Sequence, residues 1–231
     1  MTNRAFFCIL PRNNADGSGK TVVSGSALST NAMEQVTLKT FFLKRKIIFP
    51  YCTMAVFIKP TEDSKDIRAG DRILAVTVRS TLDMAWRRER LATLSEVVEI
   101  EPEGGSTKIT LKGLSRVSVT RFINYRSAEF RTPPPRTADP HDGTNETLRK
   151  KAQELVFLIN VEESDKLIKL LNYIVDLNQM TDFIANYFVM DFPARYRLYR
   201  ETDVVNRSRM LTVELMNLIR RLTKKRNKSP V

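Results

Sequence analysis

Few side chains in this 231-residue sequence could carry out covalent chemistry. It contains one histidine, His141, and two cysteines, Cys8 and Cys52. Ser-His-Asp and Cys-His sites depend on a positioned imidazole, and zinc sites need several thiolate or imidazole ligands. With so few histidine and cysteine side chains, the sequence predicts no catalytic residue, no metal site and no cofactor. The two cysteines also argue against a disulfide framework and indicate a reducing compartment.

A partial phosphate-binding motif, Gly-Ser-Gly-Lys-Thr, lies at residues 17–21. It resembles the end of a P-loop, whose backbone cradles phosphates at the start of a helix. A P-loop also needs an opening glycine, where this chain has Asn14, and a helix directly after the motif. The following residues are rich in Val, Ser and Gly, so we expect no nucleotide site here.

Two acidic pairs have the residue type of general acids and bases: Glu99 with Glu101, and Glu162 with Glu163. Residues two apart on a strand do share a face, but the basic side chains nearby indicate solvated edge charges. The sequence therefore predicts that the protein is not an enzyme.

One cluster has a composition typical of nucleic-acid binding. Trp86, Arg87, Arg88 and Arg90 combine a ring that can stack on a base with cations that can neutralise phosphates. The net charge of +12, with a basic C-terminal stretch at 220–228, adds a general attraction for polyanions. The alternative is a surface loop whose Trp86 packs back on the protein.

Two regions of different periodicity must position these residues. Residues 1–38 are rich in Asn, Gly, Ser and Thr, which predicts a largely disordered leader. Residues 39–131 contain short β-type runs, which predict a β-rich subdomain. Four prolines mark a linker at 132–144. Apolar residues then recur with the helical period over 145–223, which predicts a helical subdomain, and a basic tail follows at 224–231.

The composition predicts a chain that folds into a globular structure without inserting into a membrane. At 42% apolar residues it can build a core without disulfides or metals. No apolar run approaches the roughly 20 residues that cross a bilayer, and the run at 5–10 is too short for a signal peptide. We therefore expect no membrane association and a cytoplasmic location.

The β region opens with two apolar runs, 47–49 and 54–58, on either side of Pro50. Proline fixes φ and cannot donate to a strand ladder, so the chain must bend there. The stretch therefore predicts a strand, a Phe-Pro corner and a second strand.

Four short motifs resemble, in this order, the N-terminal substrate-binding domain of the Lon protease family. They are the Phe-Pro corner with Val56-Phe57, Gly113-Leu114-Ser115-Arg116, Asp182-Phe183-Ile184-Ala185, and Asp203-Val204-Val205-Asn206-Arg207. Phe42, Tyr51, Ala55 and Lys112 stand where the family usually has Pro, Gly, Pro and Glu. We expect Gly113 to supply a φ that other residues dislike, and Arg116 to be a structural pairing residue.

The resemblance implies an α+β fold, with a PUA-like six-stranded barrel-like β subdomain followed by a helical bundle. In full-length Lon proteins this region recruits unfolded polypeptide, while separate ATPase and protease domains act on it. Because no motif of those domains is found here, the resemblance implies a stand-alone, non-catalytic polypeptide-binding module. The expected partner is an unfolded or partner polypeptide. A separate AAA+ protease as a second partner, and RNA binding as an alternative function, stay open.

The polypeptide hypothesis places binding on the first hairpin and in the cleft toward the helices. Tyr51 follows the corner, where a bend presents side chains outward, and Met54 lies on the adjoining strand. With Trp86 they form the predicted surface for apolar client segments, since Tyr and Met suit adaptable binding. Core packing is the alternative for all three, and it is the expected role of Phe49 and Phe57.

Overall fold

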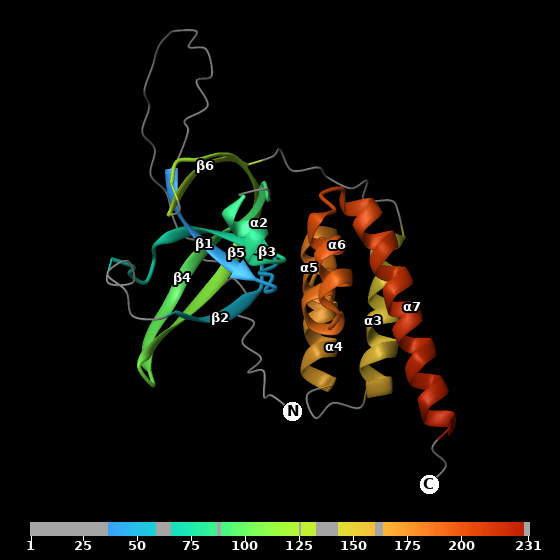
Figure 1. Ribbon diagram of the computed structural model, residues 1–231. Coiled ribbons are helices and arrows are strands. Elements are labelled where there is room, and N and C mark those ends of the chain that lie inside the picture. The colour runs from blue at the N-terminus through green and yellow to red at the C-terminus, as the bar shows by residue number, and fades with distance from the viewer. Residues whose placement is uncertain are drawn as a thin grey trace, which may run out of the picture.

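The structure is a computed structural model, and it describes residues 37–58, 66–86, 89–124, 126–132, 143–159 and 164–228. Figure 1 shows a β-subdomain from the first half of the chain beside a helical subdomain from the second. The strands are β1 (Thr37–Lys44), β2 (Thr53–Ile58), β3 (Arg72–Val78), β4 (Leu91–Glu103), β5 (Ser106–Phe122) and β6 (Ser127–Arg131). The helices are α2 (Thr81–Ala85), α3 (Thr144–Ile159), α4 (Ser164–Tyr173), α5 (Leu177–Phe188), α6 (Phe192–Arg200) and α7 (Val204–Lys228).

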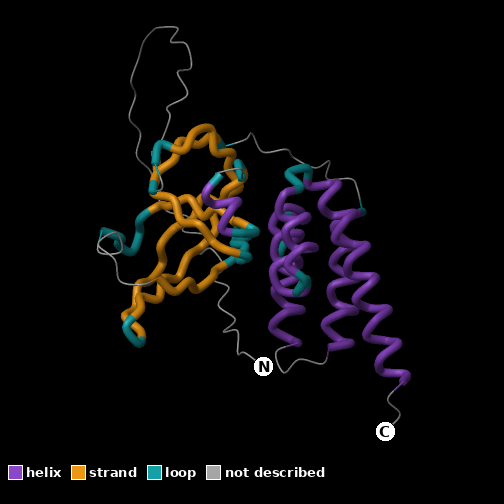
Figure 2. The backbone as a smooth tube through the Cα atoms, in the orientation of Figure 1, coloured by secondary structure: helices purple, strands orange, loops and turns teal. Residues whose placement is uncertain are grey.

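The six strands form one sheet that curls back on itself (Figure 2). Their order is β2-β5-β4-β3-β1-β6, and an additional pairing of β5 with β6 closes five of them into a barrel-like ring. Only the β1–β3 pairing is parallel among these described strands. The first half of β5 pairs with β2 and its second half with β6, so β2 lies outside the ring.

The hairpin between β4 and β5 shows why these residues form strands. Gly104 and Gly105 have φ values of +55° and +77°, the backbone that a two-residue hairpin loop with the right twist requires. Along β5, Ile109 and Leu111 are buried while Lys108 and its alternate neighbours are partly exposed. Alternate side chains of this strand therefore face the core and the solvent.

The helical subdomain buries the apolar stripes that the sequence predicts, such as Leu148, Ala152, Leu155 and Val156 of α3. Three of its helices, α5, α6 and α7, start at carboxylate caps. Asp176 accepts a hydrogen bond from Gln179 N (2.8 Å), Asp191 from Ala194 N (3.0 Å) and Asp203 from Asn206 N (2.9 Å). Such caps satisfy backbone donors that a helix leaves unpaired, worth about 1 kcal/mol each.

The core continues from one subdomain into the other. Two apolar clusters lie within the β-subdomain. A third fills the helical subdomain and also contains Ile47, Phe49 and Cys52 from the stretch between β1 and β2. The Phe-Pro corner is thus inserted among the helices, and the two subdomains share apolar packing.

The predicted α+β architecture, strands first and helices second, is confirmed. Of the predicted leader at 1–38, residues 1–36 lie outside the described residues, and Thr37 and Leu38 begin β1. Of the predicted linker at 132–144, residues 133–142 lie outside the described residues, and Thr144 begins α3. Helix α7 continues to Lys228, so the first part of the basic tail is helical. Among the described helices, none combines the length and the apolar content that crossing a bilayer requires.

Candidate functional site

The Phe-Pro corner is fixed by contacts on both sides. Phe49 is fully buried, and its ring meets that of Tyr199 edge-on at 5.9 Å. The backbone of Tyr51 donates to Gly113 O (2.8 Å), and Gly113 N donates to Cys52 O (2.9 Å). Tyr51 has a φ of +64°, in the left-handed region that favours glycine. These contacts clamp the corner onto β5.

Gly113 has a different role from the predicted one. Its φ is not in the left-handed region, where the structure places Gly70, Gly104 and Gly105. A Cβ on Gly113 would instead lie 2.3 Å from the carbonyl oxygen of Phe49. The prediction of an unusual φ was wrong, because the glycine is needed for the close approach of the corner to β5.

Arg116 and Asp182 form a buried, two-pronged ion pair across the subdomain boundary. Arg116 Nη1 and Nη2 donate to the two carboxylate oxygens at 2.7 and 2.6 Å, and Nε donates to Tyr199 O at 3.0 Å. Burial acts to lower the pKa of Arg116, but the attraction and hydrogen bonds of Asp182 outweigh it, so the pKa is raised. The prediction that Arg116 is a structural pairing residue is confirmed.

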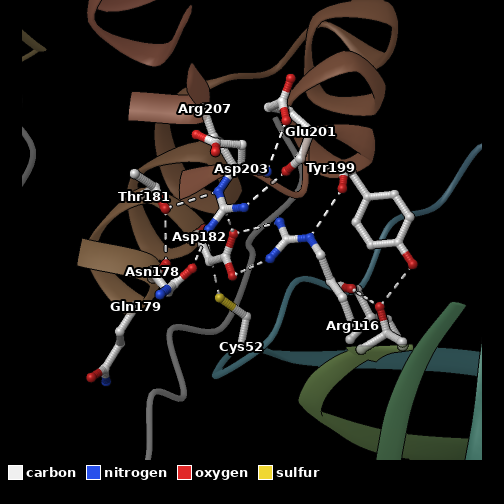
Figure 3. Close-up of polar contacts among 12 residues, drawn as sticks. Cys52, Arg116, Asn178, Gln179, Thr181, Asp182, Tyr199, Glu201, Asp203 and Arg207 are labelled. Carbon is white, nitrogen blue, oxygen red and sulfur yellow. Dashed lines mark hydrogen bonds and ion pairs between the residues drawn. The ribbon is translucent and has the colours of Figure 1, made fainter. Parts of the chain in front are cut away.

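A second guanidinium, that of Arg207, lies on the same carboxylate (Figure 3). Its Nε is 3.5 Å from Asp182 Oδ1, and both side chains are almost wholly buried. Its N–H groups also donate to three oxygens of the helical subdomain: Thr181 Oγ1 (3.0 Å), Asn178 Oδ1 (2.9 Å) and Glu201 O (2.8 Å). Burial lowers the pKa of Arg207 to about 10, which still leaves it charged at neutral pH.

The hydroxyl groups of Tyr199 and Thr93 extend this network into the barrel-like ring of strands. The Tyr199 hydroxyl lies 3.0 Å from Thr93 Oγ1, which donates to Ile48 O at 2.7 Å. Burial raises the pKa of the Tyr199 hydroxyl. Residues from all four motifs therefore meet at one buried junction, where they hold the subdomains together. Since none of these groups is open to solvent, the junction is a structural centre.

The structure places the predicted binding residues Tyr51 and Met54 in different surroundings. Tyr51 remains 44% exposed beside the junction. Met54 is partly buried and packs against a β-subdomain core, because it shares the inner face of β2 with Val56. Phe57 is 55% exposed, so its predicted core role was wrong. The first hairpin thus presents Tyr51 and Phe57, while the predicted cleft beside the corner is filled by helical packing.

Strand β2 has an unusual edge. It pairs with β5 from Thr53 to Ile58, and no second strand among the described residues pairs with its other side. Its sequence, Thr-Met-Ala-Val-Phe-Ile, has no charge, glycine or proline. Natural edge strands usually carry such residues, because an unguarded edge is a template for another strand. The exposed Phe57 side chain lies on this strand.

The tryptophan-arginine cluster is only partly described. Trp86 follows α2 and is 65% exposed, and Leu82 one turn earlier is 69% exposed. Arg90 lies over the Phe122 ring at 5.7 Å and Nη1 donates to Thr120 O (3.4 Å), so it packs against the sheet. Arg87 and Arg88 lie outside the described residues.

The acidic side chains behave as surface groups. Glu99 is exposed, and Glu101 forms an ion pair with Lys108 at 2.6 Å on the wet face of the hairpin. The phosphate-loop residues 17–21 and Glu162 and Glu163 lie outside the described part of the chain. Within that part, no group of His, Cys, Asp and Glu side chains could hold a metal ion.

A small polar pocket lies between α2 and α6. Its charged lining side chains are Arg79, Asp83, Glu89 and Arg200. Arg79 pairs with Asp83 at 3.1 Å, and the Tyr196 hydroxyl donates to Glu89. Burial first, and then the bond to Glu89, raises the pKa of Tyr196. The lining holds two cations and two carboxylates, with Arg79 and Asp83 already paired, so it does not favour a ligand of either charge.

Comparison with known proteins agrees with the geometry. A family model for the ATP-dependent protease La (LON) substrate-binding domain matches residues 37–217. The N-terminal domain of the Mycobacterium avium complex Lon protease is similar in structure, with a TM-score of 0.61 and 16% identity over 78% of this chain and 98% of that chain. A Lon N-terminal domain protein from Xanthomonas campestris gives a TM-score of 0.53 and 14% identity over 77% and 98%. No curated protein sequence matches this chain. At these identities the structural matches establish the fold.

Proposed function

The chain belongs to the Lon substrate-binding domain family, and from this premise we propose that it is a non-catalytic module that binds exposed apolar segments of other polypeptides. The family assignment accounts for a substrate-recognition module. The proposal adds the kind of substrate and the surface that receives it. Unfolding or cleavage of a bound client would then depend on another protein, such as a separate AAA+ protease.

The observation that carries the proposal is the uncharged edge of β2 with its exposed aromatic side chain. Phe57 exposes 55% of its surface on a strand whose outer edge has no strand partner among the described residues. Tyr51, 44% exposed, directly precedes this strand at the corner. Isolated exposed apolar residues are common, but two aromatic side chains beside an edge that no described strand pairs with favour binding.

An extended client segment fits this surface best. Its backbone would hydrogen-bond to the edge of β2 as an added strand, while its alternate side chains would contact Phe57. Backbone bonds supply affinity without a sequence requirement, and the aromatic contacts favour apolar clients. This combination suits a protein that must accept many unfolded chains.

The buried junction supports the proposal by keeping the surface rigid. The corner is tied to β5 through Gly113, and β5 is tied to the helices through Arg116 and Asp182. A surface that does not need ordering on binding loses less affinity to conformational entropy.

The test uses a permanently unfolded client, reduced and carboxymethylated α-lactalbumin, labelled for fluorescence anisotropy. Tyr51→Ser with Phe57→Ser should weaken binding about tenfold or more, because aromatic contacts dominate such interfaces. The matched control is Tyr173→Ser with Phe157→Ser, which removes the same residue types from positions 72% and 68% exposed on the helical subdomain.

Both double variants should keep the wild-type melting temperature within a few degrees, because the changed side chains are at least partly exposed. Hydrogen exchange of the wild-type complex should show new protection of the β2 amides. Equal binding by the two double variants, or protection confined to the helices, would overturn the proposed surface.

A further inference from the structure

The backbone groups of β2 point alternately to its two sides. Gly113 N donates to Cys52 O, and the pairing of β2 with β5 continues from there in unbroken register. In an antiparallel ladder, the N–H and C=O groups of successive residues point in turn toward the partner strand and away from it. Residues at even positions of β2, like Cys52, therefore point these groups to β5. Ala55 and Phe57 point theirs to the open edge.

A second edge of the sheet is protected against pairing. Beyond Val97, no described strand pairs with the outer side of β4. This stretch carries Glu99, Glu101 and Glu103, and also Pro102, which has no N–H to offer. Charges and proline are the usual guards of an edge strand, and β2 has neither. The sheet thus protects one open edge and leaves the other available for pairing.

An extended polypeptide matches the chemistry of the β2 edge. Its N–H and C=O groups recur along the strand with the same two-residue repeat as those of Ala55 and Phe57. A second copy of this protein could supply such a strand through its own β2, but each copy has a net charge of +12, so two copies repel each other. A neutral or acidic client meets no such repulsion, and we therefore take a client polypeptide as the occupant.

Ala55 lies at the centre of the open edge and leaves a step in its outer face. Thr53, Ala55 and Phe57 share this face, whereas Val56 is buried on the opposite face. Ala55 is exposed, and Phe57 has 55% of its surface exposed. Because a methyl group is much smaller than an aromatic ring, space remains over Ala55 beside the ring of Phe57.

We propose that Ala55 fixes the register of a client on β2 and selects a large apolar side chain in that client, an inference that rests on the proposed function. The N–H and C=O of Ala55 form the central hydrogen bonds with the added strand. The client residue opposite Ala55 then lies on the outer face, over the methyl group. Directly opposed residues have Cβ atoms about 4.5–5.5 Å apart, and diagonal neighbours are within reach of aromatic side chains. A large client side chain at this position contacts Ala55 and Phe57 together.

The variant Ala55→Pro separates backbone pairing from the aromatic contact. It removes the outward N–H and leaves both the ladder to β5 and the Phe57 side chain in place. Its affinity for labelled, carboxymethylated α-lactalbumin should fall about tenfold or more, because one client carbonyl loses its donor and the proline ring obstructs the edge. Ala55→Ser keeps the N–H and nearly the same volume, so it should lose much less affinity. Circular dichroism and the melting temperature check that both variants fold.

Residue-level hydrogen exchange, measured by NMR, tests the register without any variant. In the free protein, the amides of Met54 and Val56 should be protected by the ladder to β5, and those of Ala55 and Phe57 should exchange quickly. A saturating client should protect the second pair. Absence of protection at both of these amides would overturn the inference, whatever the stability of Ala55→Pro.

Two peptides test the selected side chain. In both, Thr and Val alternate between terminal aspartates that keep the peptide soluble, and the two differ only by Phe or Ala at one central Thr position. As competitors of the labelled α-lactalbumin, the Phe peptide should be about fivefold more potent on the wild type. On Ala55→Leu, whose side chain occupies the step, this preference should disappear. Equal potency on the wild type, including no competition by either peptide, would overturn the selection.

The outcomes also separate this inference from the proposed function. If Ala55→Pro binds the client as tightly as the wild type while Tyr51→Ser with Phe57→Ser does not, the surface stands and the register is overturned. If neither variant loses affinity, the proposed function fails as well. If sedimentation shows that the wild type is a dimer and Ala55→Pro a monomer, a second copy occupies the edge, and the client assignment is overturned.

Discussion

Replacement of Asp182 by asparagine should be among the most damaging single changes in this protein. The substitution keeps the shape of the side chain but removes the charge that two buried guanidinium groups share. Arg116 has 9% and Arg207 has 1% of its side chain exposed, so water cannot replace the lost partner. Breaking one buried ion pair costs about 3–5 kcal/mol, and here two cations lose their counter-charge.

Urea denaturation should therefore show a loss of at least about 3 kcal/mol for Asp182→Asn, and the melting temperature should fall by roughly 6–20 °C. Arg116→Met should cost less, because Asp182 still has Arg207 beside it. Removing both Asp182 and Arg116 should cost less than the sum of the single changes by about 1–3 kcal/mol, since one of the orphaned cations is then gone.

The exposed pair Glu101–Lys108 provides the control. Its charged atoms are 2.6 Å apart, the same distance as in Arg116–Asp182, but its side chains are 46% and 31% exposed. Glu101→Gln should leave the urea midpoint unchanged within error, because solvent screens the pair. If the two substitutions had equal effects, burial would not explain the strength of the junction, and the reasoning would be refuted.

Two other changes test separate parts of the fold. Gly113→Ala should destabilise the protein by about 2 kcal/mol or more in urea denaturation, because the new Cβ would lie 2.3 Å from Phe49 O. The control is Gly105→Ala in the hairpin loop. If Gly113→Ala cost less stability than this loop change, the close-contact explanation would be contradicted. Burial raises the pKa of Tyr199, so the unfolded chain loses this proton first as pH rises, and stability should fall above about pH 10. Tyr199→Phe should flatten that fall in denaturation measured at pH 9–11, and an unchanged slope would show that the hydroxyl does not titrate as proposed.

The sequence predicted the architecture because its signals are local. The change from alternating to helical periodicity separated the two subdomains, and four prolines between them marked the boundary. Closure of the ring is different, since it depends on the second half of β5 leaving β2 and pairing with β6. No local pattern marks where one strand changes partner.

The candidate site was harder to predict for two reasons. In β2 almost every residue is apolar, so the alternation that distinguishes the outward Phe57 from the inward Val56 is hidden. In the junction, Arg116, Asp182 and Arg207 each lie within a family motif, but Arg116 and Asp182 are 66 positions apart along the chain. The contact between Gly113 and Phe49 likewise arises only in the folded protein, and the spacing of the two residues in the sequence does not predict it.

The position of β2 outside the closed ring has an evolutionary consequence. The ring is complete without β2, because the second half of β5 closes it through β6. Mutations on the outer face of β2 can therefore accumulate without opening the ring or disturbing the Arg116–Asp182 pair. Selection for new clients could reshape this strand quickly while the junction stays constant. Orthologues should accordingly differ more at the positions of Ala55 and Phe57 than at Gly113.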